Sequence, residues 1–210
     1  MEMSNIIDIK KSVKDAKIVA ATKYVGPNEM INLLNQGINN FGENRVDSFL
    51  EKYEALKEYK EIKWHFIGNL QTNKVRKIIG KIDYLHSLNS VKLAQTINKY
   101  LETPLNCFLE VNLTDSPTKT GISLESVSEV LLLINELENV NVIGLMTMTE
   151  PLMTDIEKEQ VFSKLKELMF ELNKAGYTNI TELSMGMSDD YLIAVSCGAT
   201  WVRLGRILFK

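Results

Sequence analysis

Eight short apolar runs alternate with amphipathic stretches along this 210-residue chain. The runs are residues 18–23, 40–44, 64–68, 82–86, 105–113, 142–148, 182–188 and 200–205. Each run has the length and side-chain content typical of a buried strand, and the stretches between runs have apolar residues at helical spacing. Two parallel strands need a crossover connection, usually a helix, so this alternation predicts a parallel α/β fold.

The number of runs favours a closed barrel of eight parallel strands, the (β/α)8 or TIM barrel, with an extra helix over residues 5–15 before the first strand. An open, doubly wound sheet is the alternative. The barrel is preferred because Phe108, Glu110 and Asn112 share one strand face, and polar side chains can line the mouth of a barrel. No linker or low-complexity segment interrupts the pattern, so we expect a single α/β domain over residues 1–210.

The composition is that of an ordinary soluble protein. The net charge of −3 gives no general attraction to nucleic acid or to an anionic membrane, and no apolar run reaches the roughly 20 residues that span a bilayer. The first residues lack the basic and then apolar pattern of a signal peptide. Cys107 and Cys197 lie in apolar surroundings without CxxC spacing, which favours buried free thiols in a reducing compartment. We therefore expect a cytoplasmic protein.

The first predicted strand ends in a lysine, Lys23, shortly before the break at Gly26 and Pro27. Desolvating an ammonium group is costly, so a lysine at the end of an apolar strand calls for an explanation. Burial lowers the pKa of a lysine in general, which would suit an amine that bonds to an aldehyde. The simpler alternative, which this stretch by itself favours, is a side chain that extends from the strand end into solvent.

In a (β/α)8 barrel, functional groups gather at the carboxyl ends of the strands. Ser188 stands at the end of the seventh predicted strand, where a short helix over residues 189–196 begins and free backbone N–H groups favour an anion. Gly205, at the end of the eighth strand, allows close approach of the backbone to a ligand. Ser188 could equally be a plain helix N-cap, and the carboxylates of Asp189 and Asp190 suit a helix N-terminus without any ligand.

Arg203 interrupts the otherwise apolar eighth strand. A guanidinium group there needs an acceptor, which could be a buried carboxylate such as that of Glu110 or an atom of a ligand. The strand ends contain no Ser-His-Asp arrangement, and His65 and His86 lack the spacing of metal ligands. We therefore expect both histidines to be core or rim residues, and we expect no metal site.

Six short motifs span most of the chain: AATK at 20–23, NFGEN at 40–44, WHFIGNLQ at 64–71, GLM at 144–146, LSMGMS at 183–188 and VRLG at 202–205. In this order they resemble the pyridoxal phosphate homeostasis proteins, a family similar to the barrel domain of alanine racemase. The resemblance implies that the cofactor pyridoxal 5′-phosphate (PLP) is bound by Lys23, Asn44, Met146, Ser188, Arg203, Gly205 and Arg206.

The resemblance also implies a role for each group. Lys23 would hold PLP as a Schiff base, Ser188 and the backbone near Gly205 would hold the phosphate, and Arg203 would lie at the pyridine nitrogen. Asn44 and Met146 would line the pocket. Arg206 stands where many relatives have a small residue, and it would add charge attraction for the phosphate if the backbone makes the contact.

The implied function is that of a cofactor holder without catalytic residues. An arginine beside the pyridine nitrogen keeps that nitrogen unprotonated because two adjacent cations repel, which makes the cofactor a weaker electron sink. Racemases of the resembled fold supply a second base, a tyrosine from another domain, whereas this chain ends at Lys210, a few residues after its last strand. We therefore expect that this chain is not an enzyme but a protein of intracellular PLP homeostasis.

The expected partners are PLP and PLP-dependent apoenzymes, with no nucleic acid and no membrane, and the expected state is a monomer. Two alternatives are a PLP-dependent enzyme that acts on small amino acids, such as a weak racemase, and an aldolase that uses Lys23 directly without a cofactor.

Overall fold

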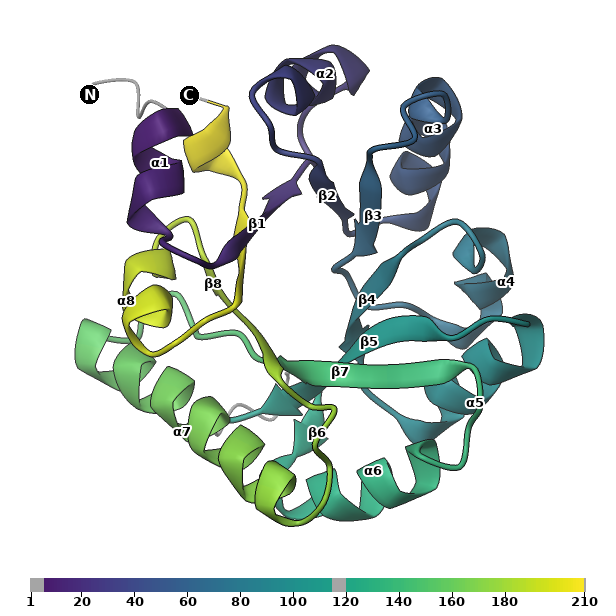
Figure 1. The fold of residues 1–210 in the computed structure, drawn as a ribbon, viewed down its shortest axis with the longest axis vertical. Coiled ribbons are helices and arrows are strands. Elements are labelled where there is room, and N and C mark those ends of the chain that lie inside the picture. Colours follow the sequence, from purple (N-terminus) through teal and green to yellow (C-terminus); the bar gives the residue numbers. More distant parts are fainter. Residues whose placement is uncertain (1–5, 115–119, 210) are drawn as a thin grey trace.

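The computed structural model describes residues 6–114 and 120–209, and within them it shows a closed parallel barrel surrounded by helices (Figure 1). The barrel strands are β1 (Lys17–Ala21), β2 (Asn40–Glu43), β3 (Lys63–Phe66), β4 (Tyr84–Leu88), β5 (Leu105–Asn112), β7 (Val140–Met146), β8 (Glu182–Met187) and β9 (Trp201–Leu204). β1 pairs with both β2 and β9, and β4 pairs with β5, so the sheet closes on itself. This closure confirms the predicted barrel and excludes the open sheet.

The helices lie outside the barrel, between consecutive strands (Figure 1). They are α1 (Ile6–Ser12), α2 (Pro27–Asn35), α3 (Val46–Leu56), α4 (Val75–Ile78), α5 (Val91–Tyr100), α6 (Val127–Ile134), α7 (Asp155–Lys174) and α8 (Tyr191–Ser196). Short 3-10 turns are η1 (Thr72–Lys74), η2 (Leu124–Ser126) and η3 (Arg206–Leu208), and the two-residue strand β6 (Ile122–Ser123) pairs with the end of β5. The helix α1 confirms the predicted N-terminal helix. The first five residues, on which the signal-peptide expectation rests, and Lys210 lie outside the described residues.

Local signals located the helix starts well. The Ser90 hydroxyl accepts a hydrogen bond from the Leu93 amide at the start of α5, and Thr154 and Glu157 form a reciprocal capping box at the start of α7. Such contacts satisfy backbone N–H groups that have no partner within the helix. The sequence predicts both caps, since Ser90 precedes an amphipathic stretch and Thr154 and Glu157 have the capping-box spacing, and the structure confirms them.

Strand boundaries differ from the prediction by one or two residues in places. β1 ends at Ala21, so Lys23 lies in the turn after the strand and not at its last position. The fourth strand begins at Tyr84, opposite His65, and not at residue 82. β7 ends at Met146, two residues before the predicted end. These limits depend on where a neighbouring strand offers a partner, which local patterns do not contain.

Two separate apolar cores flank the barrel wall. The larger core lies between the strands and the surrounding helices. The smaller one fills the barrel interior and consists of Val19, Phe108, Met146 and Trp201. His65 and His86 are fully buried and contact its rings, which confirms both as core histidines. Cys107 and Cys197 are buried free thiols, as predicted.

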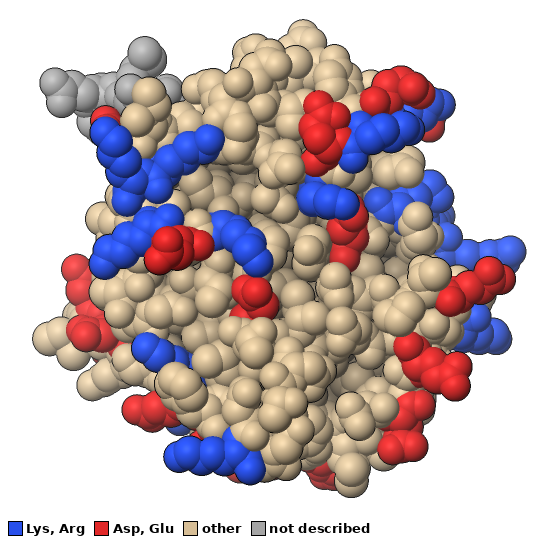
Figure 2. All heavy atoms as spheres, in the orientation of Figure 1, with Lys and Arg blue, Asp and Glu red and all other residues tan. Residues whose placement is uncertain are grey.

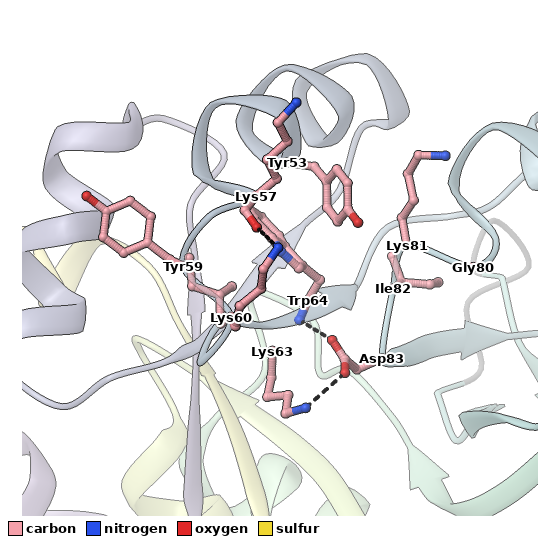
Figure 3. A pocket seen from close by; sticks show the side chains of 11 residues that line it. Tyr53, Lys57, Tyr59, Lys60, Lys63, Trp64, Gly80, Lys81, Ile82 and Asp83 are labelled. Carbon is pink, nitrogen blue, oxygen red and sulfur yellow. Dashed lines mark hydrogen bonds and ion pairs between the residues drawn. The ribbon is translucent and has the colours of Figure 1, made fainter.

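A hollow of about 250 Å³ lies at the amino ends of β3 and β4 (Figure 3). Four lysines line it, and the ammonium groups of three of them contact oxygen atoms of the protein. Lys57 pairs with Glu54, Lys60 donates to the Lys57 carbonyl at 2.7 Å, and Lys63 lies 3.3 Å from a carboxylate oxygen of Asp83. This hollow lies at the end of the barrel opposite to the predicted site.

Charge is mixed on the face of the molecule that Figure 2 shows. Figure 2 shows basic and acidic side chains interspersed over the face in view, so that this face has no field of a single sign. Among the described residues, no helix combines the length and the apolar content needed to cross a bilayer.

Candidate functional site

A cavity of about 670 Å³ opens at the carboxyl ends of β1, β8 and β9. Its size is typical of small-molecule sites. The lining residues are Ala21, Lys23, Tyr24, Val25, Met187, Ser188, Asp189, Arg203, Gly205, Arg206 and Phe209. Three strands that are adjacent in the barrel thus bring together segments from both ends of the chain.

Five of the seven predicted site residues line this cavity: Lys23, Ser188, Arg203, Gly205 and Arg206. The other two lie elsewhere. Asn44 follows β2 and is exposed to solvent. Met146 is buried in the barrel interior, packed with Phe108 and Trp201. Sequence reasoning did not assign Tyr24 or Phe209 to the site, although both follow a predicted strand end.

Lys23 is held by a tight turn. The Val25 amide donates a hydrogen bond to the Thr22 carbonyl at 3.1 Å, and Lys23 and Tyr24 are the two residues between them. The Lys23 side chain is exposed, with its ammonium nitrogen 4.8 Å from the centre of the Tyr24 ring. Lys23 is therefore not the buried strand residue that was considered. Its amine is accessible at the wall of the cavity.

Ser188 and Gly205 meet across the cavity. The Gly205 amide donates a hydrogen bond to the Ser188 hydroxyl oxygen at 3.1 Å, which leaves the Ser188 O–H free to donate to another group. Ser188 is not the N-cap of α8, because that position belongs to Asp190. The plain N-cap interpretation of Ser188 was therefore wrong. The two donors instead lie at neighbouring strand ends.

The acidic pair after Ser188 is engaged by protein groups. Asp190 is buried and accepts hydrogen bonds from the Met187 amide at 2.6 Å and the Thr149 hydroxyl at 2.5 Å. Asp189 is exposed and pairs with Arg206 at 2.8 Å. This ion pair offsets the carboxylate charge that would otherwise repel an anion at Ser188.

The fold does not require a glycine at position 205, and the absence of a side chain there leaves space in the cavity. An added Cβ would lie 3.7 Å from the nearest atoms of Ala21, an ordinary contact, and the backbone has no positive φ. Gly186 in β8 is different, because its φ is +88° and an added Cβ would come within 2.6 Å of Ala194. The fold therefore needs a glycine at 186, whereas at 205 the absent side chain enlarges the cavity.

Arg203 is buried at the base of the cavity. One terminal nitrogen, Nη1, donates to the Ser184 carbonyl at 2.8 Å and to the Ser184 hydroxyl at 2.6 Å, and Nη2 donates to the Thr147 carbonyl at 3.0 Å. Burial lowers the pKa of Arg203 to about 10, while the charges of Asp190 and Glu110 oppose the shift. The guanidinium therefore stays charged at neutral pH. Its acceptors are uncharged oxygens and not the Glu110 carboxylate that was considered.

A chain of hydrogen bonds runs from Arg203 through the barrel interior. The Ser184 hydroxyl lies 2.7 Å from His86 Nδ1, His86 Nε2 lies 2.9 Å from His65 Nδ1, and His65 Nε2 lies 3.1 Å from the Asn40 side-chain oxygen. Because that amide oxygen can only accept, each histidine has one consistent tautomer, with the proton on Nε2. Every donor then points away from Arg203, so the chain accepts from the guanidinium.

Both histidines in this chain are neutral. Burial, followed by the charge of Lys17, lowers the pKa of His65 to about 3. Burial also lowers the pKa of His86 well below its usual range, with further contributions from His65 and Arg203. Neutral rings are what the tautomers require, since a second ring proton would face a donor. The contact between His65 and His86 depends on the pairing of β3 with β4, which the sequence did not reveal.

The geometry defines a small-molecule-binding barrel with an accessible amine, a buried fixed cation and a pair of neutral donors at one mouth. A family model described as "Alanine racemase, N-terminal domain" matches residues 3–210. A relative called pyridoxal phosphate homeostasis protein, from Aquifex aeolicus (strain VF5), is 42% identical over 197 residues, which cover 92% of this chain and 86% of the relative.

Solved structures agree with these matches. PipY from Synechococcus elongatus PCC7942, without PLP, has a TM-score of 0.93 at 30% identity and covers 98% of both chains. The same protein with PLP bound has a TM-score of 0.88 at 30% identity, covering 94% of this chain and 93% of PipY. This chain therefore belongs to the pyridoxal phosphate homeostasis proteins, within the alanine racemase N-terminal domain family. The resemblance carried by the six motifs is confirmed.

Proposed function

We propose that this protein binds PLP in the cavity at the ends of β1, β8 and β9 and serves PLP homeostasis without turning over a substrate. The observation that carries the proposal is that one cavity collects the Lys23 amine, the donor pair of Ser188 and Gly205, and the Arg203 guanidinium. An amine, an anion-binding donor pair and a fixed cation match the aldehyde, phosphate and pyridine nitrogen of PLP. The name of the Aquifex relative and the PLP-bound PipY structure support the same ligand.

Lys23 is proposed to hold the ligand covalently. Its amine nitrogen bonds to the aldehyde carbon of PLP as a Schiff base, and the aldehyde oxygen leaves as water. The exposed position of Lys23 in the turn favours both the attack and the reverse reaction with water. A covalent bond that forms and reverses at an open mouth suits a protein that stores and releases its ligand.

Ser188, Gly205 and Arg206 are proposed to bind the phosphate. The Ser188 O–H is free to donate to the phosphate, and the Gly205 amide can exchange the Ser188 oxygen for a phosphate oxygen, because hydrogen bonds to charged groups are the stronger ones. The absent side chain at Gly205 leaves room for the phosphate to approach the backbone. Arg206, paired with Asp189 at the surface, adds attraction without burying a charge.

Arg203 is proposed to face the pyridine nitrogen and to keep it unprotonated. When bound, PLP supplies a ring that withdraws electrons from attached carbon atoms, and it does so best when this nitrogen is protonated. Arg203 keeps its charge at neutral pH and is held by three hydrogen bonds. A fixed positive charge at this point disfavours protonation of the adjacent pyridine nitrogen, because two neighbouring cations repel each other. The arrangement therefore suits binding better than catalysis.

A weak PLP-dependent enzyme acting on small amino acids is the second candidate, and Tyr24 is the observation that favours it. Its phenol lines the cavity, and a tyrosine can act as a proton carrier. However, Tyr24 is adjacent to Lys23 in the same turn and is 79% exposed. Two-base racemisation needs proton carriers on opposite faces of the ligand, and neighbours in one tight turn are poorly arranged for that. We therefore favour a non-catalytic PLP-binding protein over a PLP-dependent enzyme.

We further propose that residues 1–210 act as one cytoplasmic, monomeric PLP-binding domain and that PLP-dependent apoenzymes receive the ligand. The location of the amine at an open mouth supports release to a recipient. Asn44 and Met146 are proposed to support the site from the neighbouring strands β2 and β7, since neither lines the cavity directly.

The test is to mix the protein with PLP, follow the visible absorption band of the adduct, reduce with borohydride and map the modified lysine by mass spectrometry. We expect a band that disappears on reduction and a modification on Lys23. A protein that shows no band and no retained PLP would contradict the proposal. An aldolase that uses Lys23 without PLP would instead be trapped by borohydride with a carbonyl substrate alone.

A further inference from the structure

We infer that Lys52 and Glu43 are positioning residues that hold the turn of Lys23 in place for bond formation with PLP. The inference rests on the proposed function, because it concerns how the same lysine is presented to its ligand. Neither residue lines the cavity. Both lie on the outer side of the barrel, between β1, β2 and α3.

Lys52 lies on the buried face of α3. The buried residues of this helix are Phe49, Lys52 and Leu56, whose spacing forms one face of an α-helix that packs against the barrel. Lys52 is only 7% exposed, although an ammonium group is costly to bury and is almost never found inside without partners. The Lys52 amine must therefore have partners within the protein.

The Lys52 amine binds two groups at the end of β1 and β2. It donates to the Thr22 carbonyl oxygen at 2.6 Å and forms an ion pair with Oε1 of Glu43. The Thr22 hydroxyl donates to the same Glu43 oxygen at 2.5 Å. Glu43 and Thr22 are fully buried, so these three side chains form a closed cluster away from water.

The Thr22 carbonyl is the atom on which the Lys23 turn closes. It accepts the Val25 amide at 3.1 Å as well as the Lys52 amine, so the turn and the buried cation share one acceptor. A displacement of this oxygen would move Lys23 directly, because Lys23 is the next residue. Lys52 thus fixes the backbone from outside the barrel while the Lys23 side chain stays free inside the mouth.

A contribution to folding stability does not by itself explain the buried ion pair of Lys52 and Glu43. Burying an ion pair often costs as much as it contributes, and well-packed apolar residues of similar size can be equally stable or better. The second carboxylate oxygen of Glu43 has no hydrogen-bond partner among residues 6–114 and 120–209, so part of its desolvation cost is not recovered. What the pair does supply is a directed hydrogen bond to the Thr22 carbonyl, which no apolar pair can make.

The experiment compares the unmodified protein with the double variant Lys52→Met/Glu43→Leu, which keeps the packing volume but removes the hydrogen bond to Thr22. Lys57→Met is the matched control, because Lys57 is an exposed lysine at the end of the same helix. The measurements are the urea midpoint and the rate at which the PLP absorption band appears. We expect the double variant to keep its midpoint and to form the band about tenfold more slowly, or slower still, consistent with losing a hydrogen bond from a charged donor. The control should match the unmodified protein.

A second double variant keeps the test valid if Lys52→Met/Glu43→Leu does not fold. Lys52→Gln/Glu43→Gln removes both charges, keeps polar groups in the cluster, and has a side chain too short to reach the Thr22 carbonyl as lysine does. The same loss of rate is expected in any folded variant. A folded variant that forms the band at the rate of the unmodified protein would overturn the inference. If the unmodified protein and the Lys57→Met control form no band, the proposed function fails, and the inference falls with it.

Discussion

The Gly205 amide donates a hydrogen bond to the Ser188 hydroxyl oxygen at 3.1 Å, although the two residues are 17 positions apart and follow different strands. They meet because β8 and β9 are parallel neighbours in which Met187 lies opposite Arg203. Parallel strands bring their carboxyl ends to the same rim. This contact joins the two donors that we propose to bind the phosphate of PLP.

Replacing Ser188 with alanine is expected to weaken PLP binding by about 1–3 kcal/mol, the usual cost of losing a hydrogen bond to a charged group in a buried setting. PLP affinity measured by equilibrium titration gives the comparison. Ser196→Ala is the control, because Ser196 is exposed on α8 and only donates to the Ile193 carbonyl. Equal affinities in the two variants would place the phosphate elsewhere.

Gly205→Ala is expected to fold normally and to bind PLP poorly. An added Cβ meets only ordinary contacts at 3.7 Å, so the free energy of unfolding should change little, while the methyl group occupies space in the cavity. Gly186→Ala provides the contrast, because its positive φ and a 2.6 Å contact predict a loss of stability. Urea unfolding and PLP titration of both variants separate the two effects. A strongly destabilised Gly205→Ala would show that the fold requires this glycine.

Lys23→Ala should abolish the reducible adduct and leave stability nearly unchanged. The side chain is exposed, and its nearest described aromatic contact is the neighbouring Tyr24 ring, so its removal disturbs no packing. Thermal unfolding and mass spectrometry after borohydride reduction check the two parts. Lys57→Ala, another exposed lysine, serves as the control. Reduced adduct on a different lysine in the unmodified protein would refute the assignment.

Stability should fall as the pH drops below about 6.5, the ordinary pKa of histidine in an unfolded chain. The folded-state pKa of His65 is about 3, and that of His86 is also lowered, so below pH 6.5 the unfolded state binds protons that the folded state does not. Each histidine then removes about 1.4 kcal/mol of stability per pH unit, and for His65 this continues until the pH approaches its folded pKa.

Urea unfolding between about pH 7 and 5 measures this slope before most carboxylates titrate. These two are the only histidines in the chain, so ring nitrogen NMR shifts report on them without ambiguity. Both rings should stay neutral, with the proton on Nε2, throughout this range. Ring signals that titrate near pH 6.5 in the folded protein would contradict the buried hydrogen-bond chain.

The PLP-loaded protein should exchange the α-proton of L-alanine with D₂O only at a trace rate. In the proposed arrangement Arg203 faces the pyridine nitrogen and disfavours its protonation, and loss of one acid–base partner typically lowers a rate by ~10²–10⁴-fold. Arg203→Gln, which removes the charge but keeps an amide donor, should raise the exchange rate. Tyr24→Phe tests the alternative: if the unmodified protein exchanges rapidly with inversion and Tyr24→Phe abolishes it, the protein is an enzyme.

Much of the architecture is readable from local patterns. The runs of apolar residues predict the barrel strands because a buried strand needs them, and Ser90 and Thr154 predict helix starts because a cap satisfies nearby backbone groups. Lys23, Ser188, Arg203 and Gly205 could be grouped in advance because parallel strands share a rim. The sequence therefore predicts which types of chemical group the cavity brings together.

The partners of these groups were not foreseeable. Ser188 was considered as a helix cap, but its partner is the Gly205 amide. Glu110 was considered for Arg203, but the acceptors are oxygens of Ser184 and Thr147. Each pairing depends on the register between different strands, and a local pattern does not record register.

The sequence by itself determined the order and type of the elements, since short-range periodicity and capping decide these within a few residues. Only the tertiary structure decided how the end of β1 is held, because the Thr22 carbonyl, which closes the local turn with the Val25 amide, also accepts a hydrogen bond from the buried Lys52 amine 30 residues away. Closing the barrel brought His65, His86 and Arg203 into one chain of hydrogen bonds. Buried polar groups must find partners, and the closed sheet determines which partners lie within reach.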